Sequence, residues 1–443
     1  MNKMPTSIDF EKYRDRLEIQ KPTEDVGKVT EVRGFLIKGI VPGASVGSLC
    51  KIQSLYGRKS YLAEVIGFAS REVFLMPLED FESIGHGSKI ILHRIQPRVP
   101  VGDELIGRVV DGLGRSIDGK GSIFSGKDAS LYNVGVNPLS RPPIREPMSL
   151  GVRAIDALNT LGKGQRVGIM AGSGVGKSVL LGMMAKNSTA DVNVIALIGE
   201  RGREVREFIE NILGPEGLAR SVIVVATSDQ SPLMRTRAAF YAKTIAESFS
   251  AQGQDVLFMM DSATRFAMAQ REIGLNLGEP PTMRGYTPSV FSLLPKLLER
   301  AGQFEQGGSI TGLYTVLVEG DDMDDPIGDT IRSIVDGHIV LSRRLAHRGH
   351  FPAIDILQSA SRVMLSVTEK EHQRSAVQIK NWLAHYEEAE DIINIGAYQE
   401  GANPVLDDAV RNRDAVISFL KQDIEEGSNY TESIHQLMRI AGS

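Results

Sequence analysis

The first 22 residues carry apolar side chains at helical spacing. Phe10, Tyr13 and Leu17 are three or four residues apart and fall on one face of a helix. We therefore expect a short amphipathic helix within residues 1–22. The pattern fits a frayed surface helix as well as a docking site for a partner protein.

Residues 23–96 change to short β-rich runs separated by glycine turns, for example at 32–37 and 61–66. Closely spaced strands with turn signals predict a small antiparallel β-barrel. A barrel of this kind can bind oligonucleotides when it carries a basic groove with stacking aromatic side chains. This segment has few residues of either kind, so a structural role is favoured.

From residue 97 to 367 the pattern changes again, first to a loop-rich passage and then to apolar strands that alternate with helices. The strand candidates are residues 166–170, 192–198, 222–226, 256–260, 310–318 and 338–341. This alternation predicts an α/β domain with a mostly parallel sheet covered on both faces. Residues 368–443 instead predict several short amphipathic helices, and hence a helical carboxyl-terminal domain.

The composition agrees with a folded protein of two or three domains. At 443 residues the chain exceeds what one hydrophobic core usually supports. Its 42% hydrophobic and 24% charged residues are ordinary values for a globular protein. The formal net charge of -5 provides no broad basic field, so binding to nucleic acid is not expected.

Three features predict a cytoplasmic protein. Cys50 is the single cysteine, which excludes an intramolecular disulfide and a cysteine-based zinc site and fits a reducing compartment. The amino terminus lacks the apolar core of a signal peptide. The sequence also has no apolar run long enough to cross a bilayer. Any association with a membrane is therefore expected to be peripheral.

The clearest chemical motif is a glycine-rich loop between the predicted strand at 166–170 and an apolar helix. Its residues are Ala171, Gly172, Ser173, Gly174, Val175, Gly176, Lys177 and Ser178, with Val179 continuing the helix. Glycines let consecutive backbone N–H groups surround phosphate oxygens at the positive end of a helix. In such a P-loop, Lys177 reaches the β and γ phosphates of ATP and the Ser178 hydroxyl holds Mg²⁺. The strand-loop-helix context argues against a chance glycine loop.

Two carboxylates are expected at the same edge of the sheet. Asp261 ends the predicted strand at 256–260, where a carboxylate can orient the water shell of Mg²⁺. Glu200 follows the strand at 192–198 and can polarise a water for attack on the γ-phosphate. Taken singly, the first is an ordinary helix cap and the second belongs to a solvated charged loop. Their convergence with the P-loop favours an ATP-hydrolysing site.

Further motifs give the chain a family resemblance. They are PVGDELIGR (residues 100–108), GERGRE (199–204), GSIT (308–311) and LSR (341–343). On these motifs the chain resembles, over nearly its whole length, the type III protein export ATPases, ring ATPases related to the catalytic subunit of rotary ATP synthases. The segments YTVLVEGDD (314–322) and DGHIVL (336–341) are similar to export ATPases and unlike rotary synthase subunits. INIGAYQEGANP (393–404) is more similar to flagellar than to virulence members, which favours flagellar export.

The resemblance implies roles for individual residues. Glu200 matches the family's catalytic glutamate, and Arg201 and Glu204 stand beside the Mg²⁺ water shell. Arg265 matches an arginine that senses the γ-phosphate. Phe351 stands where relatives commonly place a tyrosine against the adenine ring, and stacking survives that exchange.

Arg362 matches the arginine finger, which in this family reaches the nucleotide site of the neighbouring subunit. Rotary synthases place the finger on a separate noncatalytic subunit that lacks the catalytic glutamate. Because this chain carries both Glu200 and Arg362, it is expected to complete its own ring, a homohexamer. Without the resemblance, Arg362 is indistinguishable from a plain surface arginine.

The resemblance also implies partners at the cytoplasmic face of the inner membrane. They are a stator-like regulator at the amino-terminal helix, a stalk protein, the export gate and chaperone-substrate complexes. Residues 278–281 and 285–288 are candidate pore loops, and their Gly and Pro content fits structural turns equally well.

Three alternatives stay open: a virulence-type secretion ATPase, a rotary synthase subunit and an RNA translocase. The synthase subunit fits less well because Glu200 and Arg362 lie on one chain. The translocase fits less well because the predicted barrel lacks a basic, aromatic surface.

Overall fold

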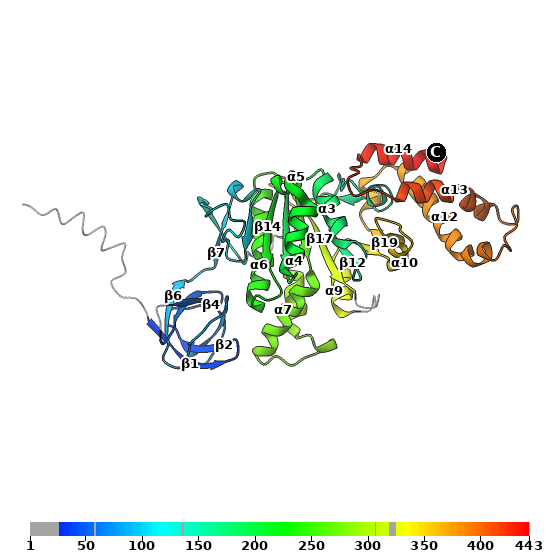
Figure 1. Ribbon diagram of the computed structural model, residues 1–443. Helices are drawn as coiled ribbons and strands as arrows, with labels where there is room; N and C mark the ends of the chain where they lie inside the picture. The colour runs from blue at the N-terminus through cyan, green and yellow to red at the C-terminus, as the bar shows by residue number, and fades with distance from the viewer. Residues whose placement is uncertain (1–25, 57–58, 134–136, 306, 319–324, 443) are drawn as a thin grey trace, which may run out of the picture. The chain divides into compact units, whose positions relative to one another are not determined.

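The computed structural model describes residues 26–56, 59–133, 137–305, 307–318 and 325–442 (Figure 1). The chain divides into two compact units, one ending at Pro97 and the other beginning at Arg98. The expected amino-terminal helix, residues 1–22, lies outside the described residues. The expected boundary between residues 367 and 368 stays a prediction.

The first unit is a closed β-barrel, as the sequence predicts. Its described strands are β1 (Val26–Arg33), β2 (Leu36–Ile40), β3 (Leu49–Gln53), β4 (Ser60–Ala69), β5 (Glu72–Pro77) and β6 (Lys89–Arg94). They pair antiparallel in the order β1-β2-β5-β4-β3-β6, and β1 also pairs with β6 to close the barrel. Ile37, Ile52 and Leu75 fill the interior together with Cys50. Burial raises the pKa of the Cys50 thiol to about 12, so this cysteine behaves as an inert core residue.

The second unit is built on a mostly parallel sheet. Its described strands are β8 (Val109–Asp111), β12 (Arg166–Ala171), β13 (Val192–Ile198), β14 (Ser221–Ala226), β15 (Val256–Asp261), β16 (Gly302–Gln303), β17 (Ser309–Leu317), β18 (Gly337–Leu341) and β19 (Ile354–Ser361). The order is β19-β18-β12-β17-β15-β13-β14-β8, and β16 pairs with β17. β19 and β16 run antiparallel to their neighbours, whereas the other pairs are parallel. Every residue of β13, β14 and β15 is buried, as expected for strands covered on both faces.

Helices pack on this sheet and continue to the carboxyl terminus (Figure 1). They are α2 (Arg153–Leu158), α3 (Lys177–Asn187), α4 (Gly202–Glu207), η3 (Phe208–Leu213), α5 (Gly214–Ala219), α6 (Pro232–Ser250), α7 (Ala263–Asn276), α8 (Pro288–Leu298), α9 (Pro326–Ile334), α10 (Arg343–His347), α11 (Met364–Val367), α12 (Lys370–Asn394), α13 (Pro404–Leu420) and α14 (Tyr430–Ala441). The candidate pore loops join α7 to α8. Across the described residues, each helix is either too short or too polar to span a membrane.

Two features of this unit were not predicted from the sequence. The passage after residue 97, expected as loops, contributes β8 to the sheet and the paired strands β7 (Arg98–Val101) and β9 (Lys127–Ser130). These strands have three or four residues, too few for a hydrophobic period to stand out. The carboxyl-terminal residues are helical as expected, but α12 is 25 residues long instead of short.

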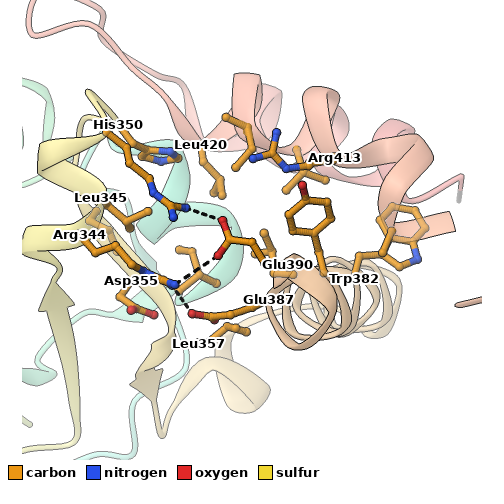
Figure 2. Close-up of a pocket in the computed structure, with 18 residues that line it drawn as sticks. Arg344, Leu345, His350, Asp355, Leu357, Trp382, Glu387, Glu390, Arg413 and Leu420 are labelled. Atoms are coloured by element: carbon orange, nitrogen blue, oxygen red, sulfur yellow. Dashed lines mark hydrogen bonds and ion pairs between the residues drawn. The ribbon is translucent and has the colours of Figure 1, made fainter. Parts of the chain in front are cut away.

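The carboxyl-terminal helices share a core with the sheet. Trp382 of α12 and Phe419 of α13 belong to the same hydrophobic cluster as Ile354 and Ile356 of β19. A cavity of 120 Å³ remains between β19, α10, α12 and α13 (Figure 2).

Ion pairs bridge the edge of this cavity. Arg344 of α10 pairs with Glu387 and Glu390 of α12, and Arg348 Nη1 lies 2.7 Å from Glu390 Oε1 (Figure 2). The helical region is therefore attached to the sheet by apolar packing and by charge pairs.

Candidate active site

The glycine-rich loop joins β12 to α3, as its context predicts. Gly174 and Gly176 have φ angles of 77° and 87°, a left-handed conformation that favours glycine. Gly176 is the cap residue of α3 and has no side chain to bond the first free N–H groups of the helix. Those amides, at the positive end of the helix dipole, suit phosphate oxygens.

The loop exposes only part of its length. Ser173 and Gly174 are exposed, whereas Ala171, Gly172 and Val175 are buried. The buried residues fix the loop to the sheet, and the exposed ones leave its tip open to a ligand.

Four adjacent strands bring opposite charges together at the carboxyl edge of the sheet. Lys177, after β12, forms an ion pair with Asp261 at the end of β15, and its Nζ lies 3.8 Å from Oε1 of Glu200, after β13. Thr315 on β17 donates a hydrogen bond of 2.7 Å to Oδ1 of Asp261. The side chains of Lys177, Glu200 and Asp261 are only 13%, 16% and 6% exposed, so water screens their charges weakly.

The protonation of Glu200 is perturbed. Burial raises the pKa of Glu200 to about 7, with further increases from the Asp261 carboxylate and from a hydrogen bond with Glu204, while the Lys177 ammonium opposes the rise. A base whose pKa lies near neutrality can accept a proton efficiently at physiological pH. Glu200 therefore has the electrostatic setting of a general base.

Oxygen donors suited to Mg²⁺ lie on the elements at this edge of the sheet. Ser178 lies in the first turn of α3, Glu204 lies on α4 and Asp261 ends β15. Hydroxyl and carboxylate oxygens match the preference of Mg²⁺, which also keeps several waters and binds substrate phosphates. In the described parts of the chain, no three His, Cys, Asp or Glu side chains are grouped to hold a metal by themselves. The donor set therefore fits Mg²⁺ that is bound together with a phosphate.

Two arginines flank Glu200. Nη1 of Arg201 lies 3.6 Å from Oε1 of Glu204, and the Arg201 side chain is 77% exposed, which places it at the solvent rim. Arg265, in the first turn of α7, packs so closely on Gly199 that a Cβ there would come within 2.7 Å of the Arg265 Cβ. Its Nε is buried and has no hydrogen-bond partner among the described residues, so this donor is available to a ligand.

A larger cavity, of 670 Å³, opens beside the P-loop helix, a volume within the range of small-molecule sites. Val179 of α3 lines it on one side. Phe351 lines it from the strap, residues 349–353, which joins α10 to β19. The Phe351 ring lies 3.7 Å from where a Cβ on Gly176 would stand, and the residue is 47% exposed. An apolar ring is thus placed beside the phosphate-binding loop, as a nucleobase requires.

The remaining wall of this cavity was not identified from the sequence. It is formed by Arg153 and by the wall segment, residues 418–426, which contains the end of α13 and the irregular chain after it. Arg153 and Phe419 are 266 residues apart in the sequence, and no short motif connects them.

Arg362 does not reach this site. Ser361, at the end of β19, pairs with Gly337 at the start of β18, so Arg362 lies at the amino edge of the sheet. Its N–H donates a hydrogen bond of 2.9 Å to the Asp336 carbonyl, and Nε of Arg166 donates one of 3.0 Å to the Asp336 carboxylate. Arg166 begins β12 and the P-loop follows its other end, about 16 Å away at 3.3 Å per residue.

Two family models match parts of the second unit. Residues 151–361 match the family model described as ATP synthase alpha/beta family, nucleotide-binding domain, and residues 368–439 match that of the T3SS EscN ATPase C-terminal domain. The chain is 52% identical to the flagellum-specific ATP synthase of Bacillus subtilis (strain 168) over 430 residues, 97% of this chain and 98% of that protein.

Two solved structures are similar over most of the chain. The assembled ATPase EscN of the enteropathogenic E. coli type III secretion system has a TM-score of 0.88 and 48% identity, covering 94% of this chain and 100% of that one. EscN in complex with its central stalk EscO has a TM-score of 0.87 and 47% identity, with the same coverage.

Proposed function

The chain belongs to the type III protein export ATPases of the ATP synthase alpha/beta family, and on that premise we propose that it hydrolyses Mg-ATP as a homohexameric ring in flagellar protein export. It is an ATP-hydrolysing enzyme by family. What we propose beyond this activity is the role of each site residue, the assembly into a ring and the flagellar branch of the family.

The residues at the carboxyl edge divide the chemistry between them. Lys177 leaves Asp261 to bind the phosphates, and the P-loop amides hold the same oxygens. Glu200 orients the attacking water and accepts its proton, while Arg265 contacts the γ-phosphate through its free donor. Mg²⁺ would be held by oxygens of Ser178 and Asp261, with Glu204 beside its water shell. When bound, it neutralises charge on the phosphates.

One observation supports the assembly of the chain into a ring. Arg362 is exposed and lies at the amino edge of the sheet, whereas its own P-loop lies at the carboxyl edge, at the far end of β12, a strand about 16 Å long. A finger at that distance cannot complete the site of its own chain, but it can reach a neighbour. Each chain therefore supplies Glu200 to one interface and Arg362 to another.

The test is a mixture of two inactive variants. Arg362→Ala alone should lower ring-stimulated hydrolysis by roughly 10³-fold, as arginine fingers do, while ATP binding by the isolated protomer stays near wild type. Glu200→Gln alone should also be inactive. Rings that contain both variants include some complete interfaces, so the mixture should recover part of the activity.

Concentration distinguishes the remaining outcomes. If mixed rings form without recovering activity, either Arg362 acts within its own chain or turnover needs consecutive intact sites. Specific activity of the wild type that rises steeply with protein concentration supports sites shared between subunits. A flat dependence in a monomeric sample refutes them.

The flagellar branch is supported by 52% identity to a flagellum-specific relative, against 47% to the type 3 secretion system ATPase of Xanthomonas euvesicatoria over a similar length. Restored motility in a strain that lacks its flagellar export ATPase, without restored secretion in an injectisome mutant, would support this assignment. The reverse pattern would establish the virulence alternative.

The partners follow from the same premise. The relative EscN is described in complex with its central stalk EscO, and we extend a stalk partner to this chain. A stator-like regulator at residues 1–22, the export gate and chaperone-substrate complexes complete the proposal, with peripheral attachment to the cytoplasmic face of the membrane. Binding of the purified stalk protein should raise the ATPase rate, whereas single-stranded RNA should not.

A further inference from the structure

The wall segment, residues 418–426, faces α3 across the 670 Å³ cavity. Helix α13 ends at Leu420, and residues 421–429 contain no helix or strand. A stretch without regular hydrogen bonding does not keep its position unless other groups hold it. Its attachment therefore decides the shape of the cavity that Phe351 also lines.

Arg153 provides most of that attachment. It begins α2, its side chain is 13% exposed, and Nε donates a hydrogen bond of 3.0 Å to the Phe419 carbonyl. Nη2 donates one of 2.5 Å to the Lys421 carbonyl, and the guanidinium forms an ion pair with Glu426. One planar, five-donor group thus holds the wall segment near both of its ends.

Glu426 is ionised in this pairing. The hydrogen bond from Arg153, with the charge attraction behind it, keeps the pKa of Glu426 below its usual range despite partial burial. Since Glu426 is 42% exposed, charge attraction alone is weak, and the two carbonyl contacts give Arg153 its geometric hold.

Gln422 connects this wall to the other one. Its backbone N–H donates a hydrogen bond of 3.0 Å to the Phe351 carbonyl. Its side-chain oxygen accepts one of 2.9 Å from the Arg153 N–H, and Nε2 donates to the carbonyls of Gly151 and Glu426 at 2.8 and 2.7 Å. The oxygen and the nitrogen of the side-chain amide are both hydrogen-bonded within the protein. Gln422 therefore links the wall segment to Arg153 and to the strap that carries Phe351.

We infer that Arg153 is a positioning residue for the base subsite: it fixes the wall segment, which lines with Phe351 the cavity that would take an uncharged planar nucleobase. The inference rests on the proposed nucleotide site and adds the group that shapes its base end. A wall that is attached in advance need not be ordered when the base binds, which favours affinity.

A general role in docking the carboxyl-terminal helices is the alternative. Docking has other anchors: His372 Nε2 lies 2.6 Å from the Ala157 carbonyl, and Lys380 Nζ donates a hydrogen bond of 3.0 Å to Asn159. The ion pairs of α10 with α12 form a further set (Figure 2). Loss of Arg153 should therefore release the wall segment and leave the helices in place.

Inorganic tripolyphosphate separates the two roles, because it can occupy the P-loop without a base. In full-length Arg153→Gln, the dissociation constant of ADP should rise about tenfold, the loss expected when one or two groups must be ordered on binding. The dissociation constant of tripolyphosphate should stay within twofold of wild type. Arg411→Gln, which removes an exposed ion pair with Asp408 on α13, is the matched control and should change neither.

Two conservative variants guard against a folding defect. Arg153→Lys keeps the positive charge beside Glu426 but lacks the forked guanidinium that bonds both carbonyls. Glu426→Gln keeps the carbonyl contacts of Arg153. Each variant should therefore lower the affinity for ADP by less than Arg153→Gln does. Equal losses for ADP and tripolyphosphate would make Arg153 a general structural residue, and unchanged ADP affinity in all three variants would overturn the inference. If tripolyphosphate binding does not depend on Lys177, the proposed nucleotide site itself fails, and the inference with it.

Discussion

The two ends of the nucleotide site are built from different materials. At the phosphate end, Lys177, Glu200 and Asp261 each follow or end one of several neighbouring parallel strands, and the sheet fixes their distances. At the base end, Phe351 and most of the wall segment come from irregular chain and are joined by hydrogen bonds between distant residues. The sheet thus supplies rigid placement for charge, whereas the base end depends on how the carboxyl-terminal helices are attached.

The largest effect should come from Lys177→Ala. Removing the ammonium takes away the main positive charge at the phosphates, so ATPase activity should fall at least about 10³-fold. The fold should persist, since Glu200, whose pKa is about 7, can take up a proton and relieve its repulsion with Asp261. Steady-state ATPase rates together with circular dichroism check this, and near wild-type turnover in a folded variant would exclude the P-loop assignment.

Glu200→Gln should separate binding from chemistry at the same end. The amide keeps the shape of the side chain but cannot accept the proton, so turnover of bound ATP should fall about 10²–10⁴-fold. The dissociation constant for Mg-ATP should remain close to wild type. Single-turnover hydrolysis beside equilibrium binding measures both, and weakened binding with normal turnover would contradict the assigned role.

Phe351→Ala tests the base end. Loss of the phenyl ring should raise the dissociation constant of ADP about tenfold, the usual scale of aromatic stacking on a base. The dissociation constant of tripolyphosphate should stay unchanged. Phe351→Tyr retains the ring and should bind ADP like wild type. Competition binding with both ligands provides the measurement. A parallel loss of tripolyphosphate affinity would mean that the two ends are not separable.

The smallest effect concerns stability and pH without nucleotide. The folded pKa of Glu200, about 7, exceeds its ordinary value of 4.5, so the stabilisation from its neutral form is complete below pH 4.5 and is lost as pH rises through 7. Glu200→Gln has no such loss. Its melting temperature should therefore exceed that of wild type above pH 7, by a margin that shrinks toward pH 4.5. A margin independent of pH would contradict the raised pKa.

The same contrast explains what the sequence could predict. The barrel, the mostly parallel sheet and the helical end were predicted and are confirmed, because each rests on a local period or motif. The convergence of Lys177, Glu200 and Asp261 was expected because residues at the carboxyl ends of parallel strands meet at one edge. Their catalytic roles, like those of Arg265 and Arg362, stay predictions.

Arg153 and the wall segment could not be predicted. Arginine at the start of a helix and a loop after one are ordinary in any chain, and their contact appears only when helices from the end of the chain dock on α2. β8, at three residues, is likewise recognised only by its pairing with β14.

Strand β12 joins two places that act on different nucleotides in the proposed ring. One end leads into the P-loop, and the other holds Asp336, which in turn holds Arg362. Covalent geometry and the ladders on both sides prevent the strand from stretching, so it behaves as a stiff rod. If β12 shifts along its axis when its own site fills, it would also move the arginine that the chain supplies to the next subunit. The order in which the sites around the ring hydrolyse ATP would then be set mechanically, by a single strand six residues long.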